Sequence, residues 1–284
     1  MKRRDEVASV LAGDVEFNHV RQPVIIAGPC VIESYEHAVD MAHTLRQIVE
    51  EHGFRFIFKS SYDKANRSSI RAFRGPGIRE GLAILGAIRD AVRVPILTDI
   101  HSVDQIAPAA EIVDMIQIPA FLCRQTDLYR EAGKYPVAVN VKKGQFMSPA
   151  SMRNVVEKAR ESGIRNLVLT ERGVSFGYER LVVDFTGLVD MKELAVPVVF
   201  DGTHSVQLPG AGGDCTMGNR RYVRDLCRAA AAIGVHGFFL EVHRHPETAP
   251  CDGPNMITPE TLRDILSDIV RINGSLKEKS DDGS

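Results

Sequence analysis

The chain lacks the cysteine pattern of a disulfide-stabilised secreted protein. Its five cysteines, at positions 30, 123, 215, 227 and 251, are an odd number and form no Cys-x-x-Cys pair. A disulfide framework is therefore not expected, and a cytoplasmic enzyme is the default interpretation.

Long apolar runs and a strong net charge are also missing. The longest charge-free apolar run, residues 229–240, is far below the roughly 20 residues that span a bilayer. The basic start is followed by an apolar run, 7–12, that is too short for a secretory signal. Because the net charge is only −2, we expect no nucleic acid and no membrane as partners.

What is present is a regular alternation of strand-like and helix-like segments. Segments with helical spacing carry apolar stripes, such as Val39, Ala42, Leu45, Ile48 and Val49, or Tyr222, Val223, Leu226, Cys227 and Ala230. Short β-prone apolar runs separate them, near 24–29, 55–60, 94–99, 114–118, 136–141, 166–170, 197–201 and 237–242.

Eight strands alternating with about eight helices predict an α/β protein built from parallel βαβ units. No glycine-rich dinucleotide fingerprint follows the first run, so a single (β/α)8 TIM barrel fits better than an open sheet. We place a short N-terminal extension packing on the barrel at 1–22, the barrel at 23–273 and a flexible tail at 274–284.

Four positions are expected to mark helix ends. Ser148 and Thr258 each precede a proline and predict helix N-caps, while Gly163 and Gly274 stand where helices should stop.

In such barrels the active site lies at the C-terminal ends of the strands, and here polar residues follow every predicted strand. One of them alone would usually be a solvated rim residue or a helix cap. The whole set instead predicts one site, and its members are Cys30, Lys59, Lys64, Asn66, Arg67, Asp99, His101, Gln117, Asn140, Lys142, Glu171, Arg172, Asp201, His204, Glu241 and His243.

Five Lys and Arg residues of this set, together with Arg124, predict an anion site. About six positive charges would surround one mouth, which suits a pair of phosphorylated substrates, one also carrying a carboxylate. The six residues are Lys59, Lys64, Arg67, Arg124, Lys142 and Arg172.

Four residues form a candidate metal site. Cys30, His204, Glu241 and Asp252 follow strands one, seven and eight, which are neighbours in a closed barrel. One thiolate, one imidazole and two carboxylates suit one divalent ion per subunit, Fe²⁺, Zn²⁺ or Mn²⁺. For Cys30 alone, a small buried apolar side chain is the competing interpretation.

Residues 205–219, with Gly210 and Gly213, favour a mobile lid.

Several long motifs resemble the 3-deoxy-D-manno-octulosonate 8-phosphate synthases. They are Lys-Ser-Ser-Tyr-Asp-Lys-Ala-Asn-Arg-Ser-Ser (59–69), Phe-Arg-Gly-Pro-Gly (73–77), Gln-Ile-Pro-Ala-Phe-Leu-Cys-Arg-Gln-Thr-Asp-Leu (117–128), Asn-Val-Lys-Lys-Gly-Gln-Phe (140–146), Thr-Glu-Arg-Gly (170–173), Phe-Gly-Tyr (176–178) and Asp-Gly-Thr-His-Ser-Val-Gln-Leu-Pro-Gly (201–210). They run in order from Val24 to Pro254.

The resemblance implies a cytoplasmic, homotetrameric transferase of lipopolysaccharide biosynthesis. It would condense phosphoenolpyruvate with D-arabinose 5-phosphate and water, releasing inorganic phosphate. Lys59 and Lys64 would hold the phosphoenolpyruvate carboxylate, and Lys142 and Arg172 its phosphate. The remaining implied site residues are Asn66, Arg67 and Ser68 for the sugar phosphate, Arg124 for its phosphate from a neighbouring subunit, Asp99 and Gln117 within the site, and Lys59, Lys64, Asp99 and His204 as catalytic residues.

The resemblance is to the metal-dependent branch of the family, which has cysteine at the position of Cys30. The trio Cys251-Asp252-Gly253 is more usual in the metal-independent branch. Whether His243 or His245 approaches the metal or lies on the surface stays open, as does the metal's role in polarising the aldehyde or positioning water.

Three alternatives compete with this interpretation. The related 3-deoxy-D-arabino-heptulosonate 7-phosphate synthases use erythrose 4-phosphate, but they show Lys-Pro-Arg-Thr where this chain has Lys64-Ala-Asn-Arg67. A non-catalytic sugar-phosphate-binding barrel would be expected to have lost part of the site. An aldolase with a Schiff base on Lys142 would leave the clustered cations unexplained.

Overall fold

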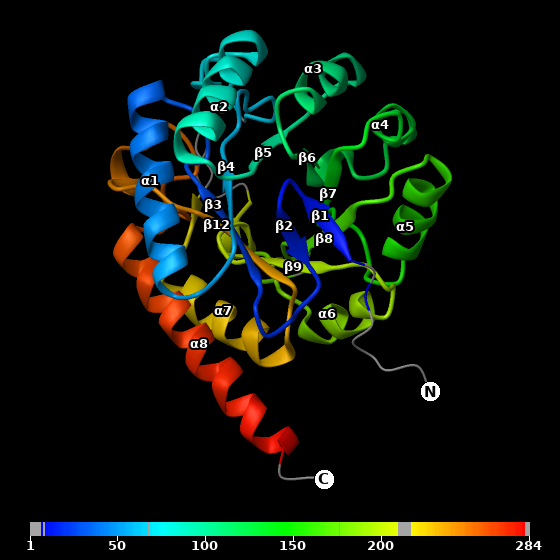
Figure 1. The fold of residues 1–284 in the computed structure, drawn as a ribbon, viewed down its shortest axis with the longest axis vertical. Helices are drawn as coiled ribbons and strands as arrows, with labels where there is room; N and C mark the ends of the chain where they lie inside the picture. The colour runs from blue at the N-terminus through cyan, green and yellow to red at the C-terminus, as the bar shows by residue number, and fades with distance from the viewer. Residues whose placement is uncertain (1–6, 8, 68, 176, 210–216, 282–284) are drawn as a thin grey trace.

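A closed barrel of eight parallel strands forms the centre of the molecule (Figure 1). The computed structural model describes residues 7, 9–67, 69–175, 177–209 and 217–281. The barrel confirms the (β/α)8 fold, and each strand lies on one of the eight predicted runs. In hydrogen-bonded order the strands are β12 (Gly237–Glu241), β3 (Val24–Gly28), β4 (Phe56–Lys59), β5 (Ile96–Asp99), β6 (Met115–Ile118), β7 (Ala138–Lys142), β8 (Leu167–Glu171) and β9 (Val198–Asp201).

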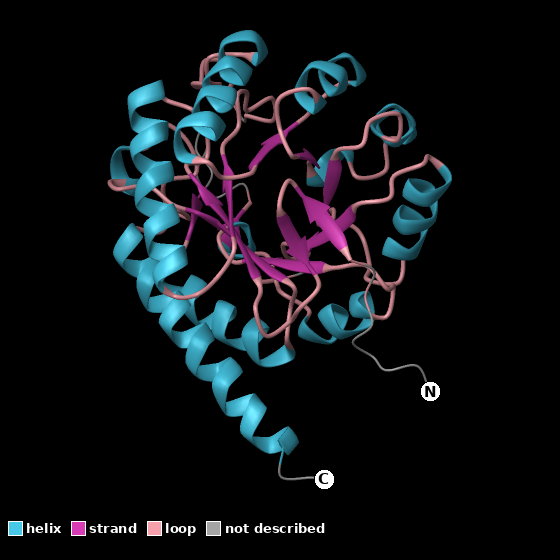
Figure 2. Ribbon diagram, in the orientation of Figure 1, coloured by secondary structure: helices cyan, strands magenta, loops and turns pink. Residues whose placement is uncertain are grey.

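Helices surround the barrel on the outside (Figure 2). They are α1 (Tyr35–Glu51), α2 (Ile78–Val92), α3 (Ile106–Ala110), α4 (Thr126–Ala132), α5 (Met152–Glu161), α6 (Phe185–Lys192), α7 (Val223–Ile233) and α8 (Pro259–Asp281). The predicted stripes face the barrel, because Leu45 and Ile48 of α1 and Val223 and Cys227 of α7 belong to one buried cluster with outward-facing strand residues. This layer of side chains between strands and helices is the larger part of the core.

Two of the four predicted helix ends are confirmed. The Thr258 hydroxyl accepts a hydrogen bond from the Thr261 amide at 3.3 Å, which caps α8. Gly163 follows the end of α5 with φ +91°, a conformation that glycine adopts without strain.

The other two predictions are wrong. Helix α5 begins at Met152, because residues 149–151 first form a turn in which the Ser151 amide donates to the Ser148 hydroxyl. Helix α8 continues through Gly274 to Asp281. An interior glycine costs only about 1 kcal/mol relative to alanine, and it ends a helix only where the chain turns to positive φ.

The inside of the barrel is filled by a second apolar cluster, and the chain's N-terminal part contributes to it. Strands β1 (Val10–Ala12) and β2 (Val15–Phe17) form an antiparallel hairpin over the end of the barrel where the strands begin (Figure 1). Val10, Ala12, Val15 and Phe17 are buried against inward-facing residues from all eight barrel strands. The hairpin therefore closes that end of the barrel.

A second small hairpin follows β9. Strands β10 (Gln207–Leu208) and β11 (Met217–Gly218) pair antiparallel. Gly210 and Gly213 of the expected lid lie outside the described residues.

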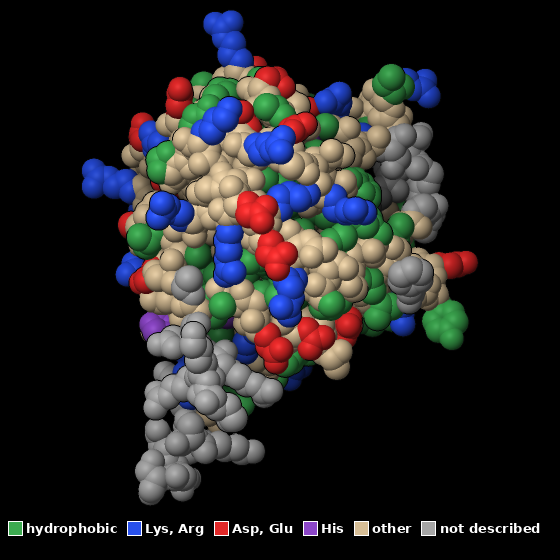
Figure 3. All heavy atoms as spheres, turned by 90° about the vertical axis from the view of Figure 1, so that its right-hand side faces the viewer, with side chains coloured by type: hydrophobic (Ala, Val, Ile, Leu, Met, Phe, Trp, Pro, Cys, Tyr) green, Lys and Arg blue, Asp and Glu red, His purple; other side chains and the backbone are tan. Residues whose placement is uncertain are grey.

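The surface carries charges of both signs, and the cysteines that the structure describes are unpaired. On the face shown in Figure 3, acidic and basic side chains alternate without a large patch of either sign. No helix within the described part of the chain is both long and apolar enough to cross a bilayer. Cys30, Cys123, Cys227 and Cys251 are buried free thiols, and Cys215 lies outside the described residues.

Candidate active site

The polar side chains of the site form a layer at the C-terminal ends of the barrel strands. Side chains alternate in direction along a strand, so the inward position two residues beyond each apolar interior residue faces the barrel axis again. Ile57 is thus followed by Lys59, and Phe239 by Glu241. The buried members of this layer are Lys59, Asp99, Gln117, Asn140, Thr170, Asp201 and Glu241.

On strand β3 the same inward position is Gly28, and only glycine fits there. A Cβ atom at Gly28 would lie 2.0 Å from the backbone oxygen of Lys59. The absence of a side chain therefore lets strand β4 and its lysine approach closely.

Hydrogen bonds join the layer across neighbouring strands. The Thr170 hydroxyl donates to the Asn140 side-chain oxygen at 2.6 Å, and the Asn140 amide donates to Gln117 Oε1 at 2.8 Å. The Gln117 amide in turn donates to Asp99 Oδ1. This chain fixes the orientation of both side-chain amides, so that Gln117 presents its NH₂ group to an ionised carboxylate.

Lys59 continues the network toward strand β12. Its Nζ donates to the Ser61 hydroxyl at 2.9 Å and to Glu241 Oε1 at 3.1 Å, while the Ser61 hydroxyl donates to Asp99 Oδ2 at 2.5 Å. Burial alone would raise the pKa of Glu241, but the nearby basic side chains, chiefly His204 and Lys59, outweigh burial and lower it to about 2. Burial likewise opposes the charge on Lys59, yet the carboxylates of Asp99 and Glu241 leave its pKa above the ordinary value.

A cavity of about 270 Å³ opens above this layer. It brings together ten of the residues expected at the site. These ten are Lys59, Lys64, Asn66, Asp99, His101, Gln117, Lys142, Arg172, His204 and Glu241.

Asp201 holds two of the side chains that line the cavity. One of its oxygens, Oδ2, contacts Lys142 Nζ and lies 2.7 Å from His204 Nδ1. The other oxygen accepts from the His204 backbone amide at 2.9 Å. The ammonium of Lys142 also lies over the Phe239 ring, 3.2 Å from its centre. Burial lowers the pKa of Lys142 to about 8 although Asp201 opposes the change.

Arg172 has an open hydrogen-bonding position that faces no acceptor among the described residues. Its Nη2 donates to Gln207 Oε1, whereas its Nη1 is enclosed and has no hydrogen-bond partner among the described residues. Burial lowers the pKa of Arg172 below its ordinary value. An enclosed guanidinium N–H without an acceptor is costly, so this position is suited to an anionic ligand.

Three of the four expected metal ligands converge next to the cavity. The donor atoms of Cys30, Glu241 and Asp252 all lie within 4.8 Å of one another. His204 lies beside this group, with Nε2 3.6 Å from Glu241 Oε1. Glu241 Oε2 is buried and has no hydrogen-bond partner in the described structure. Burial raises the pKa of the Cys30 thiol well above its ordinary value.

The remaining expected residues do not line this cavity. Arg67 donates to the Pro250 carbonyl at 3.2 Å and lines a separate cavity of about 610 Å³, which Asp252 also borders. Arg124 is exposed, and Ser68 lies outside the described residues. Four of the six expected cations therefore line this cavity, and buried carboxylates offset their repulsion. The placement of all six charges around one mouth stays a prediction.

The structure also settles the positions of His243 and His245 and shows that Asp201 belongs to the site. His243 is buried and contacts Glu33 rather than lying on the surface, whereas His245 is exposed. The sequence pattern predicts Asp201 at the end of a strand but indicates no role for it. The signal that identifies it is its position two residues after Val199, an inward-facing residue of the barrel.

Comparison with known proteins finds one matching family model and similar proteins that share one name. The sequence model of the DAHP synthetase I family matches residues 10–276. A protein from Desulfatibacillum aliphaticivorans called 2-dehydro-3-deoxyphosphooctonate aldolase is 53% identical over 249 residues, which is 88% of this chain and 91% of that protein. Proteins of the same name from Trichlorobacter lovleyi (52% identical over 93% of this chain and 97% of that protein) and Geobacter sulfurreducens (49% over 94% and 98%) are also similar.

Proposed function

Because the chain belongs to the DAHP synthetase I family, we propose that it condenses phosphoenolpyruvate with D-arabinose 5-phosphate. The family match alone does not separate this reaction from the related one with erythrose 4-phosphate. The similar proteins named above are all called 2-dehydro-3-deoxyphosphooctonate aldolases, and they cover nearly the whole chain. That name describes the eight-carbon product of phosphoenolpyruvate and a five-carbon sugar phosphate.

The observation that carries the proposal is the enclosed, unpartnered Nη1 of Arg172 in a cavity that also holds Lys64 and Lys142. Lys59 and Lys142 already have carboxylate partners, but Arg172 has only a neutral partner, Gln207. A phosphate group would supply the missing acceptor, and a planar guanidinium suits it well. This arrangement favours an anionic, phosphorylated substrate over a neutral one.

The family resemblance assigns the substrate groups to these residues, and the charges in the cavity agree with the assignment. Lys59 and Lys64 lie on the Glu241 side of the cavity and would bind the phosphoenolpyruvate carboxylate. Lys142 and Arg172 would bind its phosphate. Asn66 lines the cavity but is exposed, so it suits the second, sugar substrate.

The sugar phosphate would extend beyond that cavity. Arg67 lines the neighbouring cavity and is proposed to bind it together with Ser68. Arg124 is proposed to act from a neighbouring subunit, which agrees with its exposed position in a single chain.

In the reaction, carbon 3 of the enol phosphate forms a bond to the aldehyde carbon while water adds at carbon 2. The resulting hemiketal phosphate loses inorganic phosphate by cleavage of its carbon–oxygen bond. Both substrates are anionic, so the main work of Lys59, Lys64, Lys142 and Arg172 is to offset their repulsion and hold them in contact. Asp99 stays ionised, because Lys59 and Lys64 hold its pKa below the usual range against the effect of burial.

The residues next to the cavity also fit a divalent metal. Cys30, Glu241 and Asp252 converge, Glu241 has an oxygen without a partner, and His204 is adjacent. A thiolate, an imidazole and carboxylates are ligands for Fe²⁺, Zn²⁺ or Mn²⁺. We propose that these four residues hold one such ion. When bound, it would supply Lewis-acid polarisation or orient a water molecule.

The test is phosphate release from phosphoenolpyruvate with each aldose phosphate, before and after chelation. We expect release with arabinose 5-phosphate, little with erythrose 4-phosphate, and loss of activity after chelation that added metal restores. Release with erythrose 4-phosphate alone would overturn the substrate assignment. Borohydride should trap no adduct on Lys142, since the proposed reaction contains no Schiff base. A cytoplasmic location and a homotetramer stay predictions from the family resemblance.

A further inference from the structure

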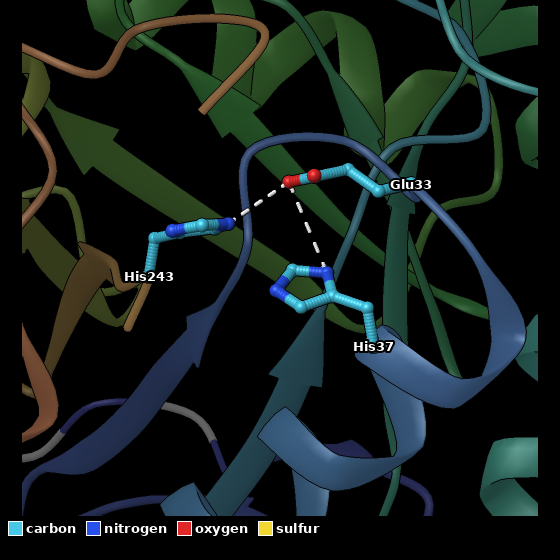
Figure 4. Close-up of side chains that lie close together, drawn as sticks. All are labelled: Glu33, His37 and His243. Carbon is cyan, nitrogen blue, oxygen red and sulfur yellow. Dashed lines mark hydrogen bonds and ion pairs between the residues drawn. The ribbon is translucent and has the colours of Figure 1, made fainter. Parts of the chain in front are cut away.

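A second group of metal-ligand side chains lies outside the cavity, formed by Glu33, His37 and His243, here called the histidine–glutamate cluster (Figure 4). Glu33 belongs to the segment between β3 and α1, His37 to the first turn of α1, and His243 to the segment after β12. The Glu33 carboxylate points toward both rings, and the donor atoms lie within 4.8 Å of one another.

His37 is the member of the cluster whose ring has no hydrogen-bond partner among the described residues. Both of its ring nitrogens are enclosed, and neither has a hydrogen-bond partner among the described residues. Its Nδ1 lies 3.8 Å from Glu33 Oε1, too far for a hydrogen bond. Burial lowers the pKa of His37, so the ring is neutral near pH 7 and has a free lone pair. An enclosed polar atom without a partner is destabilising, and a bound cation would remove this cost.

We propose that Glu33, His37 and His243 bind a second divalent cation, of the Zn²⁺ type, at a site separate from the group around Cys30. Two imidazoles and one carboxylate are a known zinc ligand set that leaves a fourth position for water. The single negative charge of Glu33 would partly balance the ion. No thiol takes part, which distinguishes this site chemically from the first.

Binding requires one proton to move. His243 Nε2 now donates to Glu33 Oε1 at 3.0 Å, and its Nδ1 accepts from the His245 amide at 3.0 Å. To coordinate through Nε2, the ring must carry its proton on Nδ1 instead. The proton therefore shifts from Nε2 to Nδ1 with no net release, and the His245 amide turns from Nδ1 to water. This loss of two hydrogen bonds opposes binding, but its cost is small beside the binding free energy of a good zinc site.

A cation at this cluster would join the two segments that carry Cys30 and Glu241. Glu33 is three residues after Cys30, and His243 is two residues after Glu241. The ion would thus fix the spacing of these segments from outside the cavity. Its role would be structural, and it needs no substrate.

The experiment measures zinc per chain by elemental analysis after equilibration with Zn²⁺ and removal of free metal. In Cys30→Ala, which removes the thiol from the first group, we expect one zinc ion per chain whose binding depends on His37. Adding His37→Gln should remove it, while adding His245→Gln, a matched change at an exposed histidine, should leave it. Glu33→Gln in the same background, with circular dichroism to verify folding, should weaken zinc binding at least tenfold.

Cobalt provides an independent readout. Co²⁺ bound to Cys30→Ala should give visible ligand-field bands but no thiolate charge-transfer band, and His37→Gln should abolish them. Equal zinc content in Cys30→Ala with and without His37→Gln overturns the second site. Loss of zinc in the His245→Gln control also overturns it, because the zinc would then be bound by surface histidines. Neither result bears on phosphate release, so the proposed activity is tested separately.

Discussion

Replacing Asp201 by asparagine should move the pH range over which the enzyme works. The Asp201 carboxylate contacts Lys142 and opposes the lowering of the lysine pKa by burial. With its pKa at about 8, Lys142 is about nine-tenths charged at pH 7. Loss of an opposite charge at this range lowers a lysine pKa by about 1–3 units. A fall of about 2 units would leave roughly one-tenth of the lysine charged at pH 7.

The expected result is a roughly tenfold loss of kcat/KM for phosphoenolpyruvate at pH 7, from the charge of Lys142 alone. The sign is fixed, because a lysine loses its positive charge as pH rises through its pKa. In the wild type, kcat/KM should therefore fall above pH 8, and in Asp201→Asn this fall should begin about 2 units lower.

The assay is phosphate release at low phosphoenolpyruvate across a pH series. Asp90→Asn removes the same charge at an exposed aspartate that pairs with Arg89, and its profile should match the wild type. A simple folding defect would lower activity at every pH without moving the midpoint. If the midpoint of Asp201→Asn stays at the wild-type value, Asp201 does not control the charge of Lys142 and the reasoning fails.

Three further outcomes are expected. Arg172→Lys should raise the KM for phosphoenolpyruvate by on the order of 10- to 100-fold, because a charge-assisted hydrogen bond contributes about 1.5–3 kcal/mol; an unchanged KM in steady-state kinetics would contradict the phosphate assignment. Cys30→Ala should lose the thiol-bound metal and most activity while it still unfolds cooperatively, and an unchanged cobalt charge-transfer band would argue against a Cys30 ligand. Leu45→Ala should cost about 2–5 kcal/mol in denaturant unfolding, because Leu45 is fully buried between α1 and the barrel; a loss below 1 kcal/mol would show that the helix repacks.

The barrel was predictable from the sequence because strands buried on both faces are short, apolar and β-prone, and helices separate them at regular intervals. The strand ends were predictable for the same reason, and they located Lys59, Asp99 and Glu241 without any knowledge of the loops. Which strand-end residues face inward depends on the two-residue alternation. Applied to Val199, that rule selects Asp201, whereas Glu171 lies outside the alternation and pairs with the buried Lys143.

Positions on the loops could not be predicted in the same way. Arg67 follows β4 by eight residues, so its place depends on the path of an irregular segment, and the structure puts it in the neighbouring cavity. Helix ends were missed where a local signal competes with its surroundings. At Ser148 a turn comes before the helix, and at Gly274 the flanking residues continue it.

The β1–β2 hairpin determines where substrates can enter the enzyme and where products can leave it. Its residues Val10, Val15 and Phe17 close the end of the barrel where the strands begin. Substrates and products must therefore enter and leave at the other end, where the strands finish. If phosphoenolpyruvate binds deep in the cavity near Lys59 and the sugar phosphate binds nearer the opening at Asn66, the bound sugar phosphate blocks access to the phosphoenolpyruvate position. The order of loading would then be set by the shape of the barrel, with the three-carbon substrate first.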